Sequence, residues 1–244
     1  MNFYFITGTS RGLGKGLAEV LLSSEENRVI GVSRSKTIEH ERYKHIAVDL
    51  LNLDEVEKEL SSIFSTDERP SSLVLINNAG ILGEMAYSGE LSSRKVEDVF
   101  KLNVTVPAVL MNEFIRIFAD VSVDKTILNI SSGAARNEYD GWSNYCASKA
   151  ALDMLSKVIA VEQKIKGNPL KIYSAAPGVV ESAMHEQIRS TNQENFSAKG
   201  KFLNMKANDL LMSPQDAAKK LLYLIDNSSD YPDVIQDVRD FVVS

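Results

Sequence analysis

The sequence predicts an α/β fold in which a parallel sheet is covered by helices on both faces. Short apolar runs alternate with helix-period patterns along all 244 residues, as strands alternate with crossover helices in such folds. The runs are apolar almost throughout, which is typical of strands buried on both faces. The length is ordinary for one α/β domain, so we expect residues 1–244 to form a single domain.

The alternation places each element in turn. Strands are expected at 2–7, 28–33, 44–48, 73–76, 125–130 and 170–175, with a short seventh at 234–235. Helices are expected after Gly14, at 53–65, 92–102, 104–119 and 143–165, and from Pro214 onward. Segment 183–212 is less regular. It suits an active-site lid, or two short amphipathic helices that cover the core, and both can hold.

Composition and charge exclude several classes of protein. The net charge is -6 and the pI about 5.2, which argues against a broad nucleic-acid surface. No window approaches a membrane span, so we expect a cytoplasmic protein that binds neither nucleic acid nor a membrane. The one cysteine, Cys146, is better explained as a small buried residue than as a nucleophile. No metal site is predicted.

A glycine-rich turn follows the first strand and opens a helix. It reads Thr7-Gly-Thr-Ser-Arg-Gly-Leu-Gly14, and this strand–turn–helix context makes a phosphate site plausible. Gly8 permits the tight turn, Gly12 lets a pyrophosphate approach the backbone, and Gly14 lets helix and strand pack closely. The spacing differs from the common G-x-G-x-x-G fingerprint, and the alternative is a plain β–α turn.

The second strand ends without the acid that binds the ribose 2′-hydroxyl of NAD. The residues there are Ser33-Arg34-Ser35. Arg34 suits a 2′-phosphate, and Arg11 in the glycine turn can reach the same group. Each arginine taken singly could be an ordinary surface charge, but together with the missing acid they favour NADPH.

Polar residues also follow the third and fourth strands. Asp49 could cap the next helix, and Asn77-Asn78-Ala79-Gly80 could be simple turn chemistry. At strand ends, they could equally hold the adenosine side of a cofactor. Asn103, at the junction of two expected helices, is either a satisfied buried amide or a kink whose backbone carbonyl binds water.

Tyr145 and Lys149 form a candidate acid–base pair. On a helix they lie one turn apart on the same face. A phenol has a pKa of about 10, and a neighbouring cation is expected to lower that pKa toward working pH. Upstream, Ser131 and Ser132 end a strand and face the ligand crevice of an open sheet. The alternative is a solvated helix face on which Tyr and Lys happen to be four positions apart.

Together these pieces resemble the short-chain dehydrogenase/reductase family over essentially the whole chain. The matching residues are Thr7, Gly8, Gly12, Gly14, Asp49, Asn77 to Gly80, Asn103, Ser132, Tyr145, Lys149, Pro177 and Gly178. The chain is most similar to the sepiapterin reductase and bacterial benzil reductase group, which reduces aromatic or vicinal carbonyls with NADPH. This narrower resemblance rests on general similarity and on the tail Asp237-Val-Arg-Asp-Phe241.

The resemblance implies a Rossmann-type fold and a role for each matching residue. Tyr145 would donate the proton, Ser132 would bind the carbonyl oxygen, Lys149 would lower the tyrosine pKa and hold the ribose, and Asn103 would hold a proton-relay water. Cofactor contacts fall on Gly8, Ser10, Arg11, Gly12, Leu13, Gly14, Arg34, Asp49, Leu50, Asn78, Ala79, Gly80, Tyr145, Lys149, Pro177, Gly178, Val180 and Ser182. Ser182 stands where the family usually has a threonine that binds the nicotinamide carboxamide, and serine keeps the hydroxyl.

The substrate site follows from chain order. Tyr139 and Trp142 lie between Ser132 and Tyr145 and should be close to the reacting carbonyl, although both could pack under the lid instead. The expected pocket comprises Ser132, Ala134, Tyr139, Trp142, Tyr145 and Met184.

The expected function is reduction of an aromatic or vicinal carbonyl, such as benzil, with NADPH. One alternative is a 3-oxoacyl-carrier-protein reductase, although Glu181, His185 and Glu186 after Pro177 do not form the basic surface that an acidic carrier needs. Another is a non-catalytic NADPH-binding regulator, although no residue of the Asn–Ser–Tyr–Lys set is lost. Apolar residues on more than one face of the helices at 104–119 and 145–165 favour a homodimer or homotetramer.

Overall fold

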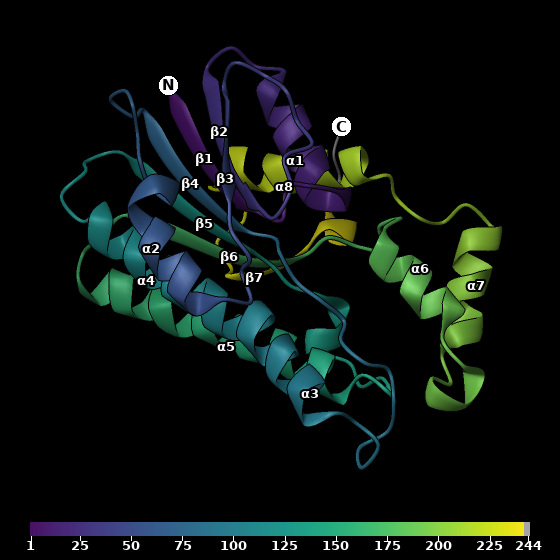
Figure 1. The fold of residues 1–244 in the computed structure, drawn as a ribbon. Coiled ribbons are helices and arrows are strands. Elements are labelled where there is room, and N and C mark those ends of the chain that lie inside the picture. The colour runs from purple at the N-terminus through teal and green to yellow at the C-terminus, as the bar shows by residue number, and fades with distance from the viewer. Residues whose placement is uncertain (242–244) are drawn as a thin grey trace.

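The computed structural model describes residues 1–241, whose strands form one parallel sheet between two layers of helices (Figure 1). The strands are β1 (Asn2–Thr7), β2 (Asn27–Ser33), β3 (Tyr43–Ala47), β4 (Ser72–Asn77), β5 (Asp124–Ile130), β6 (Leu170–Ala176) and β7 (Ile235–Asp237). Their order is β3-β2-β1-β4-β5-β6-β7, and every neighbouring pair is parallel. This confirms the predicted doubly wound, Rossmann-type α/β fold. The winding direction reverses between β1 and β4, so a ligand crevice is expected beyond their carboxyl ends.

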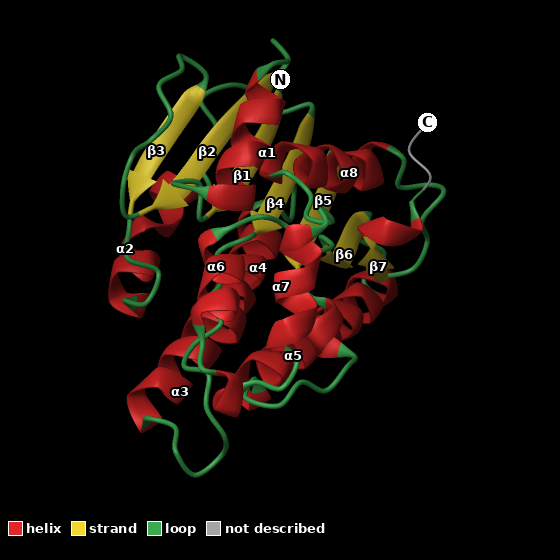
Figure 2. Ribbon diagram, turned by 90° about the vertical axis from the view of Figure 1, so that its right-hand side faces the viewer, coloured by secondary structure: helices red, strands yellow, loops and turns green. Residues whose placement is uncertain are grey.

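Each face of the sheet has its own apolar core. Successive side chains of a strand point to opposite faces, and in β1 Phe3 and Phe5 join one core while Tyr4 and Ile6 join the other. Helices α2 (Leu53–Ile63), α4 (Val106–Ile117) and α5 (Ser143–Ile165) cover the first face, whereas α1 (Gly12–Leu22) and α8 (Pro214–Asp226) cover the second (Figure 2).

The helical region around Asn103 is continuous, where two separate helices were predicted. Helix α3 (Ser93–Phe100) runs into a π-helical turn, Lys101–Thr105, and then into α4. The wider turn places Asn103 inside the protein, where its side chain is fully buried. The predicted junction is therefore a local change of helical pitch, of the kind often found at functional sites.

Segment 183–212 forms short helices at the carboxyl end of the sheet. They are α6 (Ala183–Ser190), a 3₁₀ turn at Gln193–Asn195 and α7 (Lys199–Ala207), and Figure 1 shows α6 and α7 beside the layered body of the protein. This confirms the prediction of two short helices.

Within residues 1–241, no helix is long and apolar enough to cross a membrane.

Candidate active site

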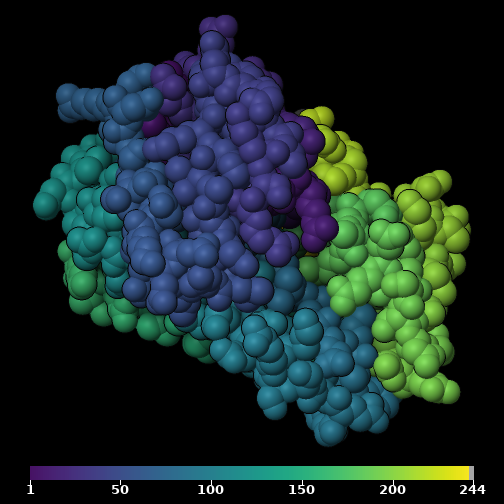
Figure 3. Space-filling view, in the orientation of Figure 1, coloured from purple at the N-terminus to yellow at the C-terminus, as the bar shows by residue number. Residues whose placement is uncertain are grey.

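A cavity of about 1010 Å³ lies beyond the carboxyl ends of the strands. The surface is hollowed where segment 183–212 (green) faces the N-terminal half (purple and blue) in Figure 3. The residues that line the cavity include every predicted cofactor and substrate residue. Asn103 is the exception among the predicted site residues, because it lies behind the wall.

The glycine turn has the geometry that its sequence predicted. Gly8 has a φ of 77°, which favours glycine. A Cβ on Gly14 would lie 2.3 Å from the carbonyl oxygen of Gly8, so only glycine allows helix α1 to approach the end of β1 this closely. A Cβ on Gly12 would meet nothing within 4 Å, so the backbone at the start of α1 faces open space in the cavity. Such a helix start with free N–H groups fits a pyrophosphate.

The loop after β4 is fastened to the end of β1. The Thr7 hydroxyl accepts hydrogen bonds from the backbone N–H groups of Asn78 and Ala79, both at 3.0 Å. The Asn78 amide donates to the carbonyl of Thr7 at 2.9 Å. These bonds place Asn78, Ala79 and Gly80 along the cavity wall.

The end of β3 and the loop after β6 complete the part of the cavity predicted to hold a cofactor. Helix α2 is capped by Asn52 and not by Asp49. The carboxylate of Asp49 instead accepts a hydrogen bond from the N–H of Leu51 at 3.1 Å. The Ser182 hydroxyl oxygen caps α6 by accepting from the N–H of His185 at 3.2 Å, which leaves its own O–H free to donate.

Arg11 and Arg34 lie at the end of the cavity next to β2. Both line the cavity and both are exposed. None of the ion pairs among residues 1–241 involves either guanidinium. Two arginines without acidic partners fit an anionic group such as a phosphate.

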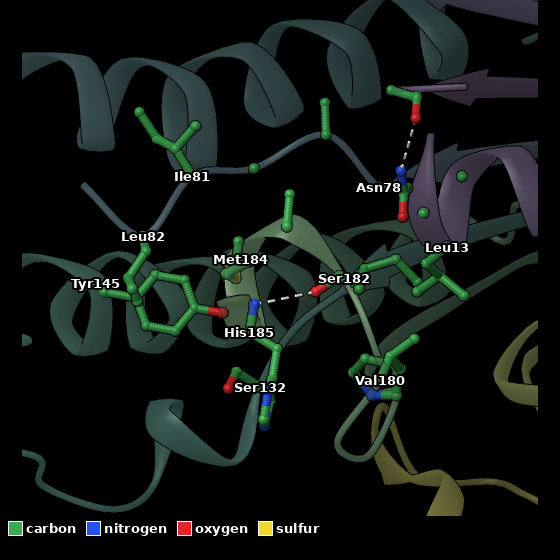
Figure 4. A pocket seen from close by; sticks show the side chains of 18 of the residues that line it. Leu13, Asn78, Ile81, Leu82, Ser132, Tyr145, Val180, Ser182, Met184 and His185 are labelled. Atoms are coloured by element: carbon green, nitrogen blue, oxygen red, sulfur yellow. Dashed lines mark hydrogen bonds between the residues drawn. The ribbon is translucent and has the colours of Figure 1, made fainter. Parts of the chain in front are cut away.

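Ser132, Tyr145 and Lys149 line the other end of the cavity. Figure 4 shows Ser132 and Tyr145 there. Tyr145 and Lys149 project from α5, whereas Ser132 lies two residues beyond the end of β5 and caps the 3₁₀ turn Gly133–Ala135. The Lys149 ammonium donates to the carbonyl of Ile130 at 2.8 Å and lies 5.8 Å from the centre of the Tyr145 ring. The Ser132 oxygen also accepts from the N–H of Ala134 at 3.1 Å, which fixes its position.

The predicted lowering of the tyrosine pKa is wrong for the chain by itself. Burial raises the pKa of Tyr145 to about 12, and hydrogen bonding with Ser132 opposes this only in part. Burial also lowers the pKa of Lys149 to about 8, against the field of Asp153. For both groups, burial therefore outweighs the opposing effect of the neighbour, which is Ser132 for Tyr145 and Asp153 for Lys149. The phenol stays protonated near neutral pH, which suits a proton donor.

The Asn103 side chain braces the loop after β4. Its amide nitrogen donates to the carbonyl of Ile81 at 2.8 Å and to the Ser148 hydroxyl at 3.1 Å, while its oxygen accepts from the N–H of Ile81 at 2.9 Å. Both amide hydrogens are thus used, as in the buried-amide alternative. A relay water bound by Asn103 stays a prediction, and it would have to use the backbone carbonyl or the second lone pair of the side-chain oxygen.

Aromatic rings form the wall beside the Tyr145 hydroxyl. Trp142 stacks on Phe196 with ring centres 4.6 Å apart, and it lies 5.0 Å from Tyr139 and 5.7 Å from Tyr145. Trp142 lines the cavity and is also buried against Phe196 of segment 183–212, so its contact with substrate stays a prediction. Ala134 and Met184 complete the predicted pocket.

Some cavity residues were absent from the predicted site. They include Leu82, Asn137, Ile188, Phe202, Met205 and Arg239. Leu82 lies two residues beyond Gly80, and the others belong to segments whose path the sequence left open. Burial raises the pKa of the half-buried Cys146 thiol, which argues further against a nucleophile. Within the described residues, no group of three or more His, Cys, Asp or Glu side chains could hold a metal ion.

Comparisons with known proteins agree with this geometry. The family model for short chain dehydrogenases matches residues 2–193. The chain is 36% identical to benzil reductase ((S)-benzoin forming) of Bacillus subtilis, over 99% of this chain and 100% of the relative. It is 30% identical to sepiapterin reductase of Mus musculus, over 90% of each chain.

Solved structures show the same fold. The crystal structure of the KRED1-Pglu enzyme has a TM-score of 0.80 at 25% identity and covers 93% of this chain and 95% of its own. A short chain dehydrogenase/reductase from Saccharomyces cerevisiae has a TM-score of 0.82 at 23% identity, over 98% and 97% of the two chains. The protein belongs to the short-chain dehydrogenase family of oxidoreductases, which act on carbonyl or alcohol groups with a nicotinamide cofactor.

Proposed function

We propose that the protein is an NADPH-dependent reductase of aromatic or vicinal carbonyls. The observation that supports this best is the position of Ser132, Tyr145 and Lys149 at one end of the cavity, beside an aromatic wall. At the other end, Arg11 and Arg34 form no ion pair with any acidic residue of the described part of the chain. A carbonyl reductase needs these same two ends, one for the reacting oxygen and one for the cofactor.

The chain's own residues supply binding and proton transfer, and the cofactor supplies the hydride when bound. Ser132 donates a hydrogen bond to the substrate carbonyl oxygen. Tyr145 gives its proton to that oxygen, which avoids a free alkoxide. Lys149 binds the ribose hydroxyls and stabilises the phenolate that is left.

An aromatic ketone or a vicinal diketone such as benzil fits the cavity wall. Tyr139, Trp142 and Phe202 offer ring surface next to the reacting groups, and aromatic pairs gain about 0.5–1.5 kcal/mol beyond simple burial. The similarity to benzil reductase along the whole chain supports the same class of substrate.

A substrate panel tests the proposal. Purified protein should consume NADPH with benzil and other aromatic ketones, as followed by loss of NADPH absorbance. Rapid turnover of a 3-oxoacyl thioester on its carrier, with none of the diketones, would identify a 3-oxoacyl-carrier-protein reductase. NADPH binding without turnover of any carbonyl would identify a regulator.

We further propose that segment 183–212 is a lid over the substrate. Asp140, in the loop before α5, accepts from the N–H and hydroxyl of Ser197 at 2.8 and 2.7 Å and from the Tyr87 hydroxyl at 3.0 Å. A Cβ on Gly141, which has a φ of 72°, would lie 2.1 Å from the carbonyl oxygen of Asn195. These contacts support a segment held closed by a few exposed hydrogen bonds and by the Trp142–Phe196 stack.

Two alanine variants separate the wall from the lid. Trp142→Ala removes ring surface from the cavity, so it should raise KM for aromatic ketones more than for small aliphatic ones. Phe196→Ala is the matched control, because Phe196 is fully buried against Trp142 but does not line the cavity. It should raise KM for both classes alike. Equal effects of Trp142→Ala on both classes would assign Trp142 to packing, and unchanged KM values in Phe196→Ala would argue against the lid.

We propose that α4 and α5 form the interface of a homodimer or homotetramer. Four apolar side chains at helical spacing on α5 are exposed, namely Met154, Val158, Val161 and Ile165. Such a stripe on a surface helix is typical of an association site. Light scattering should give a dimer or tetramer mass for the wild type and a smaller mass for Val161→Asp, and a monomeric wild type would refute the proposal.

The cytoplasmic location stays a prediction from the sequence.

A further inference from the structure

The carboxyl group of Asp153 is buried close to the catalytic residues and has no part in the reaction described above. It lies on α5 one turn beyond Lys149 and is 6% exposed. One of its oxygens accepts from the Ser131 hydroxyl at 2.6 Å and from the Ser174 hydroxyl at 2.7 Å. Among residues 1–241 it forms no ion pair within 4.0 Å, unlike the paired Asp237. A buried carboxylate is costly, so these contacts point to a role.

The two serines connect Asp153 to β6 and to the end of β5, which leads into Ser132. Ser131 directly precedes Ser132, and its N–H donates to the carbonyl of Ala175 in β6 at 2.9 Å. Ser174 of β6 pairs in the sheet with Asn129 of β5, and Asn129 lies two residues before Ser131. Asp153 therefore binds the ends of both β5 and β6 to α5.

The ammonium of Lys149 is held at the same place. It donates to the carbonyl of Ile130, the residue next to Ser131. The hydrogen bonds of Asp153 and Lys149 therefore hold adjacent residues, Ser131 and Ile130, against one helix. A shift of Asp153 would move both the hydroxyl that binds the carbonyl oxygen and the backbone that orients the ammonium.

We infer that Asp153 is a positioning residue for the reduction, which holds Ser132 through Ser131 and keeps Lys149 in its charged form. The inference rests on the proposed carbonyl reductase activity. No reacting atom touches Asp153, so its effects pass through Ser132 and Lys149.

The groups around Lys149 support the inference that Asp153 keeps this lysine charged. Tyr145 faces it from α5, the π-helical turn presents the neutral amide of Asn103, and β5 presents the Ile130 carbonyl and the hydroxyls of Ser131 and Ser132. Asp153 is the charged group whose field acts on the ammonium, and it opposes the fall that burial causes in the pKa of Lys149. Removing that negative charge should let the pKa of Lys149 fall further.

The first test needs neither cofactor nor turnover. NMR of protein labelled with ¹³C at the lysine ε-carbon follows the titration of Lys149, whose signal is assigned by its loss in Lys149→Met. In Asp153→Asn, which keeps the shape and removes the charge, the midpoint should fall by roughly 0.5–1 pH unit. Ser174→Ala is the matched control, because it removes one hydrogen bond from the same oxygen and keeps the charge, so its midpoint should not move.

Kinetics test the positioning. Asp153→Asn should lower kcat for benzil reduction by roughly tenfold through misplacement of Ser132, and the fall of kcat at high pH should begin at lower pH than in the wild type. Ser131→Ala keeps the carboxylate but loses its link to β5, so kcat should fall without a shift of the pH profile. NADPH affinity should change little in Ser131→Ala, which separates misplacement from misfolding.

Each result decides one part. An unchanged Lys149 midpoint in Asp153→Asn overturns the charge role, and wild-type kcat in Ser131→Ala overturns the positioning role. A loss of kcat in Asp153→Asn that is equal at every pH and accompanied by an unchanged midpoint would overturn the charge role and leave the positioning role alone. If Asp153→Asn does not fold, Ser131→Ala still decides the positioning. If the wild type reduces no carbonyl, the proposed function fails, whereas the NMR titration still decides the coupling.

Discussion

Replacing Tyr145 with phenylalanine should remove nearly all carbonyl reduction and leave NADPH binding largely intact. General acid catalysis contributes about 10²–10⁴-fold, and the neighbouring groups are poor substitutes. Cys146 does not line the cavity, and burial lowers the pKa of His185, so that this side chain binds an extra proton less readily than a free histidine does. Phenylalanine keeps the ring that packs edge-on against Trp142, so the fold should be preserved. Initial rates with benzil and fluorescence titration with NADPH measure the two quantities.

Tyr139→Phe is the matched control for this experiment. Tyr139 also lines the cavity and loses the same hydroxyl, but it lies outside the group formed by Ser132, Tyr145 and Lys149. Its turnover should stay within a few fold of wild type. Removal of a general acid should lower turnover by about 10²–10⁴-fold. If Tyr145→Phe keeps more than about a tenth of wild-type turnover, the loss is smaller than this and another group donates the proton.

The second large effect is expected at the cofactor's phosphate. Wild type should strongly prefer NADPH to NADH, and Arg34→Ala should reduce that preference mainly by raising KM for NADPH. A hydrogen bond to a charged group contributes roughly 1.5–3 kcal/mol, and 1.4 kcal/mol is tenfold in affinity. Loss of one such bond should therefore weaken NADPH binding by roughly ten- to a hundredfold. NADH lacks the 2′-phosphate, so its KM should change far less.

Two further arginines complete the comparison. Arg11→Ala should show a similar but separate loss, because Arg11 lines the same end of the cavity. Arg94→Ala should leave both KM values unchanged, because Arg94 is exposed on α3 and does not line the cavity. An unchanged ratio of the two cofactors in Arg34→Ala would mean that Arg34 is an ordinary surface arginine and that the phosphate is held elsewhere.

The strands and most helices could be predicted because their signals are local. Buried parallel strands are continuous apolar runs that end in polar residues, and β1 and the long helix α5 begin and end where the sequence indicated. The order of the site motifs can likewise be seen in the sequence alone. These motifs are the glycine turn, the Asn-Ala-Gly loop, the strand-end serines and the Tyr–Lys pair. These motifs follow strand ends, and parallel strands bring their carboxyl ends to one edge of a sheet. The sequence by itself therefore determined the fold class and the family, and it predicted residues that the fold brings to the wall of one cavity.

Only the tertiary structure decided the electrostatics and the supports of the site. Helical spacing brings Tyr145 and Lys149 together, but the pKa of each depends on burial by β5, the π-helical turn and segment 183–212, which are distant in the chain. The use of Asn103 as a brace for Ile81 and the contacts of Asp153 with two strands are also long-range. A pKa depends on the solvent and charges around a group in space, and a buried hydrogen bond depends on which partners the fold brings within reach. Neither is contained in the spacing of residues along the chain.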